Sequence, residues 1–454
     1  MDTINTPEKD FSTVDFGDKR LNKRLVDSIA QMSKNAKESI LSALKERGSA
    51  KAFYRLLGND KFEIEKMRKA AKESTMSRIG MYEEILLIQD TCDIDLKGHK
   101  KTEGLGYSSE HVHGVKAHNC IALVPDGLPI GLVDQTYETR AESKSTLTKK
   151  EKAARPIEEK ESYRWLDMLK ESTKSIPEGV KVITICDREG DFYELYAKMQ
   201  ETGNDFIIRV THNRKSDTDE KIVDKVRKEA ACGQVTVNIP RDSRKNIPAH
   251  QAEMEVAYIT VNVNKPINLK NVDLPEKLTM NIVRITEITV TGEVGIEWIL
   301  ATSLPVKTAE DVLKIVEYYI QRWKIERFHF VLKSGCSVEE IQQRTYEKIK
   351  PMILIYSVIA MYIMAITFIG RVLPDTLCDA FFEEDEWKIL YQIVNKSKTE
   401  PEKPYTMEEA VKYLGQLGGY KRAPSDGPAG LKVIWKGLTK LYEFITLYKN
   451  IIRK

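Results

Sequence analysis

The stretch between Lys350 and Arg371 constrains this chain most, because it has no charged residue in a sequence that is 31% charged. A run of this length and composition has to be buried, either in a bilayer or in a protein core. Four residues with polar groups interrupt it, namely Tyr356, Ser357, Tyr362 and Thr367. No difference in loop charge orients it across a bilayer. We therefore predict a buried core helix and no membrane contact, with a membrane span as the alternative.

The composition is that of a globular protein, with 41% hydrophobic residues. A chain of 454 residues is too long for one ordinary domain, and about three are expected. Its net charge is only +3, so the total charge does not indicate a nucleic-acid ligand. Six cysteines without a C-x-x-C pair indicate free thiols in a reducing compartment, and the polar N-terminus is neither a signal nor a transit peptide. We expect a cytoplasmic protein.

Shortly before the uncharged run, the segment Tyr318–Lys333 places an acid among basic and phenolic side chains. Tyr319, Arg322, Glu326 and Lys333 fall within about 60° of one face if the segment is a continuous α-helix. The acid could hold a divalent cation while its neighbours hold phosphates. The alternative is a solvated helical face with incidental ion pairs.

Two further acids follow apolar runs that are typical of buried strands. The first run, 85–88, leads to Asp90, and the second, 180–186, leads to Asp187. A carboxylate just past a strand end is exposed yet rigidly placed, and with Glu326 the two aspartates could hold two Mg²⁺ ions. Each aspartate has alternatives nearby. Asp93 or Asp95 could replace Asp90 if the first strand continues past it. Glu189 and Asp191 compete with Asp187, although Glu189 could be a turn residue and Asp191 could cap the next helix.

These motifs together resemble the IS4-type cut-and-paste transposases, in their Tn5-like branch with the Y-x2-R-x3-E-x6-K signature. The signature is complete as Tyr319, Arg322, Glu326 and Lys333, and the D-T and C-D-R-E motifs around Asp90 and Asp187 match, as does an S-D-G-P-x-G-x4-W segment near the C-terminus. The resemblance runs from about residue 16 to residue 435. It implies a catalytic and metal-binding triad of Asp90, Asp187 and Glu326, with two Mg²⁺ or Mn²⁺ ions. One departure is Gln89, where the family often has an acid.

The order of expected elements agrees with an α/β fold. Three antiparallel strands followed by helix, strand, helix and strand is the order of an RNase H-like catalytic core, which the resemblance also implies. We predict a helical DNA-binding domain over residues 1–70 and the catalytic domain over 71–372. A β-rich subdomain without helices is expected to be inserted at about 214–302. A mostly helical dimerisation region should follow over 373–454.

Several residues are candidates for contact with DNA. Lys19, Arg20, Lys23 and Arg24 form a basic band on one predicted N-terminal helix, and Arg209, Arg214 and Lys215 follow a strand at the rim of the core. Tyr319, Arg322 and Lys333 would hold phosphates. The resemblance gives Trp298 the role of receiving a base flipped out of a DNA hairpin; the alternative is a core tryptophan. Four histidines, His99, His111, His113 and His118, lack zinc-ligand spacing, and we expect them in a flexible loop facing DNA.

The resemblance implies a DNA transposase that binds terminal inverted repeats, cleaves them through a hairpin intermediate and joins the 3′ ends to target DNA. It further implies a bacterial, nucleoid-associated enzyme that forms a homodimer on double-stranded DNA. We expect the dimer contact on an apolar stripe made of Leu431, Ile434, Trp435, Leu438 and Leu441, which could instead pack on its own core. The alternatives are an RNase H-like nuclease or resolvase and a domesticated, DNA-binding transposase.

Overall fold

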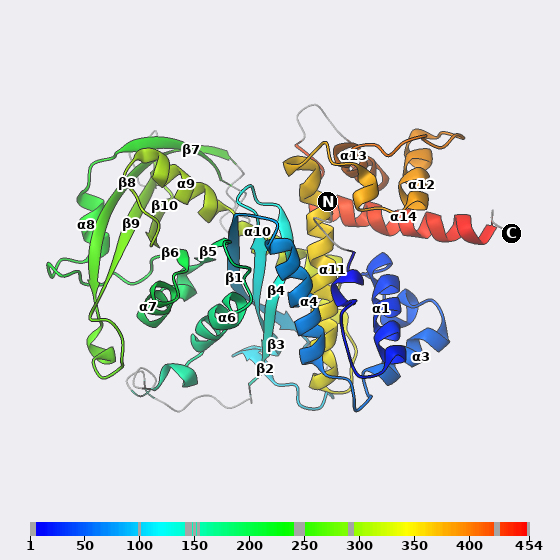
Figure 1. The fold of residues 1–454 in the computed structure, drawn as a ribbon, viewed down its shortest axis with the longest axis horizontal. Coiled ribbons are helices and arrows are strands. Elements are labelled where there is room, and N and C mark those ends of the chain that lie inside the picture. The colour runs from blue at the N-terminus through cyan, green and yellow to red at the C-terminus, as the bar shows by residue number, and fades with distance from the viewer. Residues whose placement is uncertain are drawn as a thin grey trace.

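The computed structural model describes residues 6–98, 101–140, 148, 151, 155–239, 250–288, 295–421 and 427–451. Figure 1 shows a central mixed sheet with helices on both sides, a β-rich part at one end and two helical groups at the other. The N-terminal helices are α1 (Lys19–Lys34), α2 (Ile40–Ala43), α3 (Arg47–Leu56) and α4 (Ile64–Ile79). The C-terminal helices are α12 (Glu384–Asn395), α13 (Met407–Leu417) and α14 (Leu431–Ile451).

The core of the sheet has the strand order of an RNase H-like fold, β4-β3-β1-β5-β6. Its strands are β1 (Glu84–Asp95), β3 (Val112–Leu123), β4 (Pro129–Glu138), β5 (Lys181–Cys186) and β6 (Asp205–Arg209), with a short β2 (Tyr107–Ser109) beside β3. β3 is antiparallel to β1 and β4, whereas β5 and β6 continue parallel to β1. Helices α6 (Tyr163–Thr173) and α7 (Tyr193–Glu201) provide the crossovers. The predicted fold class is confirmed.

The inserted β-rich segment extends the catalytic sheet. Its last strand, β10 (Glu297–Thr302), is antiparallel to β6, and β9 (Lys277–Glu287), β8 (His250–Asn264) and β7 (Gly233–Ile239) follow outward. The segment also contains one short helix, α8 (Ile222–Lys228), which precedes β7 and which the sequence pattern did not indicate. Pairing with β10 satisfies the backbone groups on the otherwise open edge of β6, which couples the insert to the core.

The uncharged run forms α11 (Tyr346–Val372), which is packed between the sheet and the C-terminal helices. It is the one helix among the described residues that is long and apolar enough to cross a membrane, and its most apolar window is completely buried inside the protein. Burying a Leu, Ile or Met side chain stabilises a fold by about 1.5–3 kcal/mol. The predicted core helix is therefore confirmed, and the apolar run is explained without a bilayer.

The predicted apolar stripe of the last helix lies inside the chain. Leu431, Ile434, Trp435, Leu438 and Leu441 are all at most 7% exposed, and α14 packs on α11 and α13. The prediction that these residues form the dimer contact is wrong, because they already cover the subunit's own core. The exposed face of α14 instead carries Phe444 and Leu447, which are 41% and 53% exposed.

Candidate active site

The two aspartates belong to neighbouring parallel strands, Asp90 within β1 and Asp187 directly after β5. β1 and β5 pair up to Ile88 and Ile185, and β5 ends one residue later, so Asp187 is the first residue beyond it. Its carboxylate caps the short 3-10 helix Arg188–Gly190 by accepting the Glu189 N–H at 2.8 Å. Asp90, in contrast, is not at a strand end: β1 runs on to Asp95 because β3 continues to pair with it.

Asp90 lies in an environment that favours its protonated form. Burial raises the pKa of Asp90 to about 7, and the neighbouring Asp187 and Glu326 add to this, while Arg322 opposes it. A carboxyl in such a setting is easily protonated unless positive charge is supplied. The site therefore favours the binding of a cation between its acids.

The signature segment is broken into two helices, so the prediction of one continuous helix is wrong. α9 (Ala309–Ile320) ends before Arg322, α10 (Trp323–Phe330) begins after it, and a π turn over Val331–Gly335 follows. The β3–β4 turn packs against this break, since a Cβ on Gly127, whose φ is +84°, would meet Gln321 at 2.2 Å. Only a glycine fits there.

The break aims Arg322 at the acids. Its Nη2 donates to Glu326 Oε1 at 2.8 Å, and its Nη1 lies 3.8 Å from Asp90 Oδ2. Tyr319, 2% exposed, lies beneath, with its ring centroid 5.7 Å from that of Trp298. Lys333 belongs to the π turn, and its Nζ lies 3.1 Å from Glu339 Oε1. Tyr319, Arg322 and Glu326 therefore lie close together, whereas Lys333 pairs with Glu339. Tyr319 is buried rather than presented to solvent.

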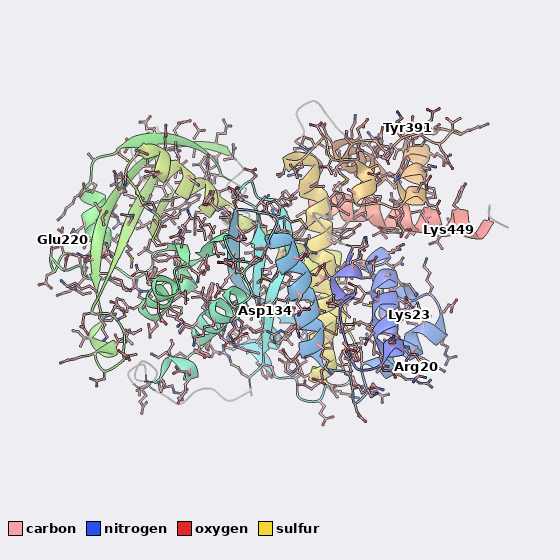
Figure 2. All side chains as sticks on the ribbon, in the orientation of Figure 1. Arg20, Lys23, Asp134, Glu220, Tyr391 and Lys449 are labelled. Atoms are coloured by element: carbon pink, nitrogen blue, oxygen red, sulfur yellow. The ribbon has the colours of Figure 1, made fainter. Side chains whose placement is uncertain are left out.

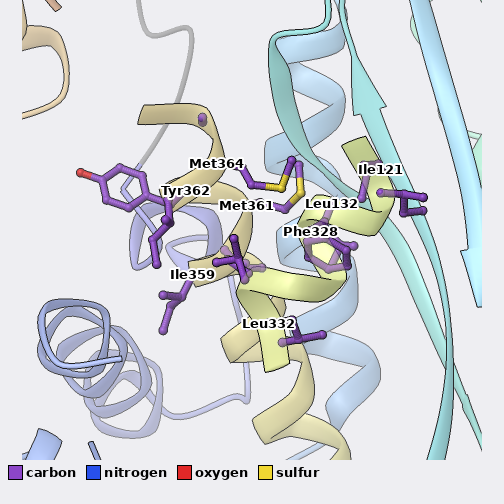
Figure 3. Packing of buried hydrophobic residues seen from close by; sticks show 14 of the residues in the cluster. Ile121, Leu132, Phe328, Leu332, Ile359, Met361, Tyr362 and Met364 are labelled. Carbon is purple, nitrogen blue, oxygen red and sulfur yellow. The ribbon is translucent and has the colours of Figure 1, made fainter. Parts of the chain in front are cut away.

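Apolar packing fixes the position of α10. Phe328 and Leu332 insert between the sheet, at Ile121 and Leu132, and the middle of α11 at Met361 (Figure 3). This packing leaves Glu326 on the opposite, half-buried side of the helix.

A buried chain of polar groups ties α10 to the sheet and to α11. His329 Nε2 lies 3.1 Å from Asn119 Nδ2, and Gln135 Nε2 donates to Asn119 Oδ1 at 2.5 Å and to Ser357 Oγ at 2.8 Å. Burial lowers the pKa of His329 to about 3, helped by Lys333 and Arg322, so the ring is neutral and can accept from Asn119. This network lies one helical turn from Glu326 and sets the rotation of α10.

Asp90, Asp187 and Glu326 are the residues that would hold divalent ions. Carboxylate oxygens are the ligands that Mg²⁺ and Mn²⁺ prefer, and the guanidinium of Arg322 supplies positive charge between two of these acids. Asp90 lies on β1, Asp187 directly follows the neighbouring strand β5, and Glu326 lies on α10. Within the described part of the chain, no three metal-ligating side chains are grouped closely enough to form a closed cage.

The rival acids have other partners. Asp93 pairs with Lys116 at 3.0 Å, and the Asp95 N–H donates to Glu339 at 3.0 Å, next to Lys333. Asp191 does not cap α7, whose N-cap is Phe192. It is buried and accepts the N–H groups of Thr211 and His212, at 2.5 and 2.7 Å, together with the guanidinium of Arg214. Asp191 therefore anchors the loop after β6.

The side chains predicted to contact DNA differ in their solvent exposure and in their partners within the protein. Arg214 is held by Asp191 and lies over Tyr196, which gives it a structural role in place of the predicted DNA contact. Arg209 is partly buried beside Tyr319, and Lys215 is exposed. Lys19, Arg20 and Lys23 project from α1 into solvent, where Figure 2 labels two of them, and Arg24 is half-buried.

The histidine loop is not present as predicted. His113 and His118 belong to β3, and His118 is buried, 2.9 Å from Thr91 Oγ1 and edge-on to Trp165. His111 lies just before β3, and His99 lies outside the described residues.

Comparison with known proteins identifies the family. Residues 86–363, more than half of the chain, match the family described as "Transposase DDE domain". The chain belongs to the DDE transposases. Residues 6–62 match "Transposase DNA-binding" and residues 358–450 match "Transposase Tn5 dimerisation domain", which together make the Tn5/IS4-type architecture. A solved structure described as "Cryo-EM structure of piggyBac transposase synaptic complex with hairpin DNA (SNHP)" is 9% identical, with a TM-score of 0.35, over 98% of this chain and 70% of that one.

The transposase is thus a metal-dependent enzyme that cuts and joins DNA, binds DNA and dimerises. The sequence analysis missed three features of its site. Glu339 and the pair Asn119 and His329 are brought in from distant positions by the fold, and no local pattern marks them. Lys324 was also overlooked, although it lies two residues from Glu326. Burial, with Arg371 and Arg327 nearby, lowers the pKa of Lys324 to about 7.

Proposed function

We propose that this transposase binds the terminal inverted repeats of its own transposon, cuts each end through a DNA hairpin and joins the freed 3′ ends to target DNA. The observation that carries this proposal is the contact of Arg322 with both Glu326 and Asp90, next to Asp187 at the end of the neighbouring strand β5. We further propose that two ions, Mg²⁺ or Mn²⁺, act per site. When bound, they would activate the attacking water or 3′-hydroxyl and stabilise the leaving 3′-oxygen.

Arg322 would hold the DNA phosphate during each transfer. A phosphate offers the same two-oxygen geometry as a carboxylate, so Arg322 can shift its N–H donors from Glu326 to a phosphate. This exchange frees the Glu326 carboxylate for its role as a ligand. Lys333, one third exposed and paired with Glu339, would add a second phosphate contact. Tyr319, buried beside Arg209 and Arg322, would keep these guanidinium groups in place.

Trp298 would accept a flipped base at the hairpin stage. In the free protein it is a core residue, 6% exposed, with Tyr319 against its ring. Base capture therefore requires local movement around Tyr319 in the DNA complex. Stacking on an aromatic ring is worth roughly 1–3 kcal/mol per base, which is sufficient to offset a modest rearrangement.

End recognition and pairing would use the two helical groups. The exposed basic residues of α1 supply phosphate contacts, and the exposed face of α14 supplies the contact between subunits. Phe444 and Leu447 line a groove of about 380 Å³ with Ile389 and Ile393 of α12. Exposed apolar side chains around a groove are typical of an interface.

The test uses duplexes taken from the two DNA flanks of the coding sequence. With Mg²⁺, the protein should nick one strand of each duplex, form a hairpin visible on a denaturing gel, and then insert the released end into a plasmid. Asp187→Asn should bind the duplex normally and cut nothing. Cutting of branched DNA without end joining would favour a resolvase, and binding without cutting in either Mg²⁺ or Mn²⁺ would favour a domesticated form.

A further inference from the structure

A second group of cations lies on the side of α10 that faces away from the acids. Lys324 and Arg327 are about 160° and 100° around α10 from Glu326, whereas Arg322 donates directly to the Glu326 carboxylate. Arg371, at the C-terminal end of α11, completes the group. These residues are not part of the signature and have no role in the metal and phosphate contacts described above.

The geometry holds these cations together around one aromatic ring. Lys324 Nζ lies 3.3 Å from the centroid of the Phe368 ring, and the guanidinium carbon of Arg371 lies 5.1 Å from it. Arg371 Nη2 also donates to the carbonyl oxygen of Ala429 at 2.9 Å, which fixes its direction. Arg327 is close enough to oppose the protonation of both.

No acid balances this group. Within the described part of the chain, no carboxylate lies within 4 Å of half-buried Lys324 or of exposed Arg327 and Arg371. Other cations of the core, such as Arg68, Lys116 and Arg164, have such a partner. Lys314 provides the contrast. It too lies over an aromatic ring, that of Tyr318 at 5.2 Å, but it pairs with Glu84 at 3.4 Å. Three converging cations without an acid repel one another, and an anion would relieve that repulsion.

We infer that Lys324, Arg327 and Arg371 form a binding site for a phosphate of the DNA backbone. This inference rests on the proposed function, in which DNA reaches the Glu326 side of α10. An α-helix is only about 10–12 Å across, so a strand with one phosphate at the acids can place a nearby phosphate on the opposite side. The DNA is either the transposon end or the target, and both present the same phosphate chemistry.

The experiment measures the salt dependence of DNA binding without divalent ions, so that cleavage plays no part. The variants are Lys324→Gln with Arg327→Gln, and Arg371→Gln, and the matched control is Lys314→Gln. Each lost phosphate contact should lower the slope of log K against log[salt] by about 0.9. The cluster variants should show this loss, and the control should keep the slope of the unaltered protein. Their Tm should be unchanged or higher, because repulsion is removed.

Two DNA probes distinguish the sources of the phosphate. A loss seen with flank duplexes assigns the site to the transposon end, and a loss seen only when a complex with pre-cleaved ends binds a plasmid assigns it to the target. Unchanged slopes with both probes would overturn the inference, and so would a fall in Tm without a slope change, which indicates structural cations. An altered oligomeric state instead would assign the group to an acidic protein surface. Failure of cleavage by the unaltered protein would contradict the proposed function and leave this binding result standing.

Discussion

Arg322 and Glu326, on either side of the start of α10, are joined by a 2.8 Å hydrogen bond between guanidinium and carboxylate. The same guanidinium lies 3.8 Å from Asp90. One side chain thus neutralises part of the charge of two acids that belong to separate elements of the fold. This arrangement makes the geometry of Arg322, and not only its charge, important for the site.

Arg322→Lys should therefore lower the nicking rate by about 10- to 100-fold, because a lysine keeps the charge but cannot contact two groups with a planar fork. The affinity for a flank duplex, measured by gel shift, should change much less. Lys388→Arg on α12 serves as the control and should cut at the normal rate. Equal nicking by Arg322→Lys would mean that charge alone is sufficient.

The raised pKa of Asp90 predicts how stability depends on pH in metal-free protein. Its folded pKa of about 7 lies above the usual value of 3.8, so the folded state binds more protons between these pH values. Stability should consequently fall as pH rises from about 4 to 7, by at most about 4 kcal/mol. Asp90→Asn should flatten this dependence and raise the Tm at pH 8, and Mg²⁺ should raise the Tm of the unaltered protein only. A Tm for Asp90→Asn that is lower at pH 8 would refute the assignment.

Trp298→Ala should slow hairpin formation or resolution while the first nick proceeds. Because Trp298 is buried, the same change costs about 3–5 kcal/mol of stability, so the more conservative Trp298→Phe is needed beside it. Phenylalanine keeps part of the stacking surface and most of the packing. On labelled flank duplexes, Trp298→Phe should make the first nick at the rate of the unaltered protein. Its rate of hairpin formation should lie between those of the unaltered protein and Trp298→Ala. If Trp298→Phe forms and resolves hairpins at the normal rate, Trp298 is a core residue only.

Asn119→Leu should destabilise the protein by about 1–3 kcal/mol, because it removes the partner of one Gln135 N–H group and of His329 Nε2. Since this network sets the rotation of α10, the nicking rate should also fall at temperatures where the protein is fully folded. Ser172→Ala, in the buried part of α6, is the control for a lost hydroxyl away from this network. Normal nicking by folded Asn119→Leu would show that the packing of Phe328 and Leu332 is sufficient.

Phe444→Asp with Leu447→Asp should prevent the pairing of two DNA ends. Both residues are exposed on α14, so the changes should leave the Tm and the binding of a single end intact. Paired and single-end complexes can be separated on a native gel. Leu438→Asp, at a buried position of the same helix, should instead unfold the C-terminal region. Normal pairing by the double variant would place the subunit contact elsewhere.

The sequence alone determined the fold class and the burial of α11, and it predicted which acids form the site. These predictions rest on local signals in the sequence. The signals are apolar runs of strand length, a long uncharged segment and the complete Y-x2-R-x3-E-x6-K spacing. The predicted alternation of side chains along β10 is also confirmed. Trp298 and Leu300 lie in one hydrophobic cluster, and Ile299 and Ala301 lie in a second cluster.

Tertiary packing decided where some elements end and which surfaces pack together, and local sequence patterns do not determine either. β1 continues past Asp90 because β3 pairs with it, and the signature helix breaks where the turn at Gly127 meets Gln321. The stripe on α14 faces inward because α11 and α13 offer it a core, although its periodicity would equally suit a partner subunit. Each of these outcomes depends on contacts between residues far apart in the chain. Hydrophobic periodicity identifies the face of an element that becomes buried, whereas only the assembled fold determines what buries it.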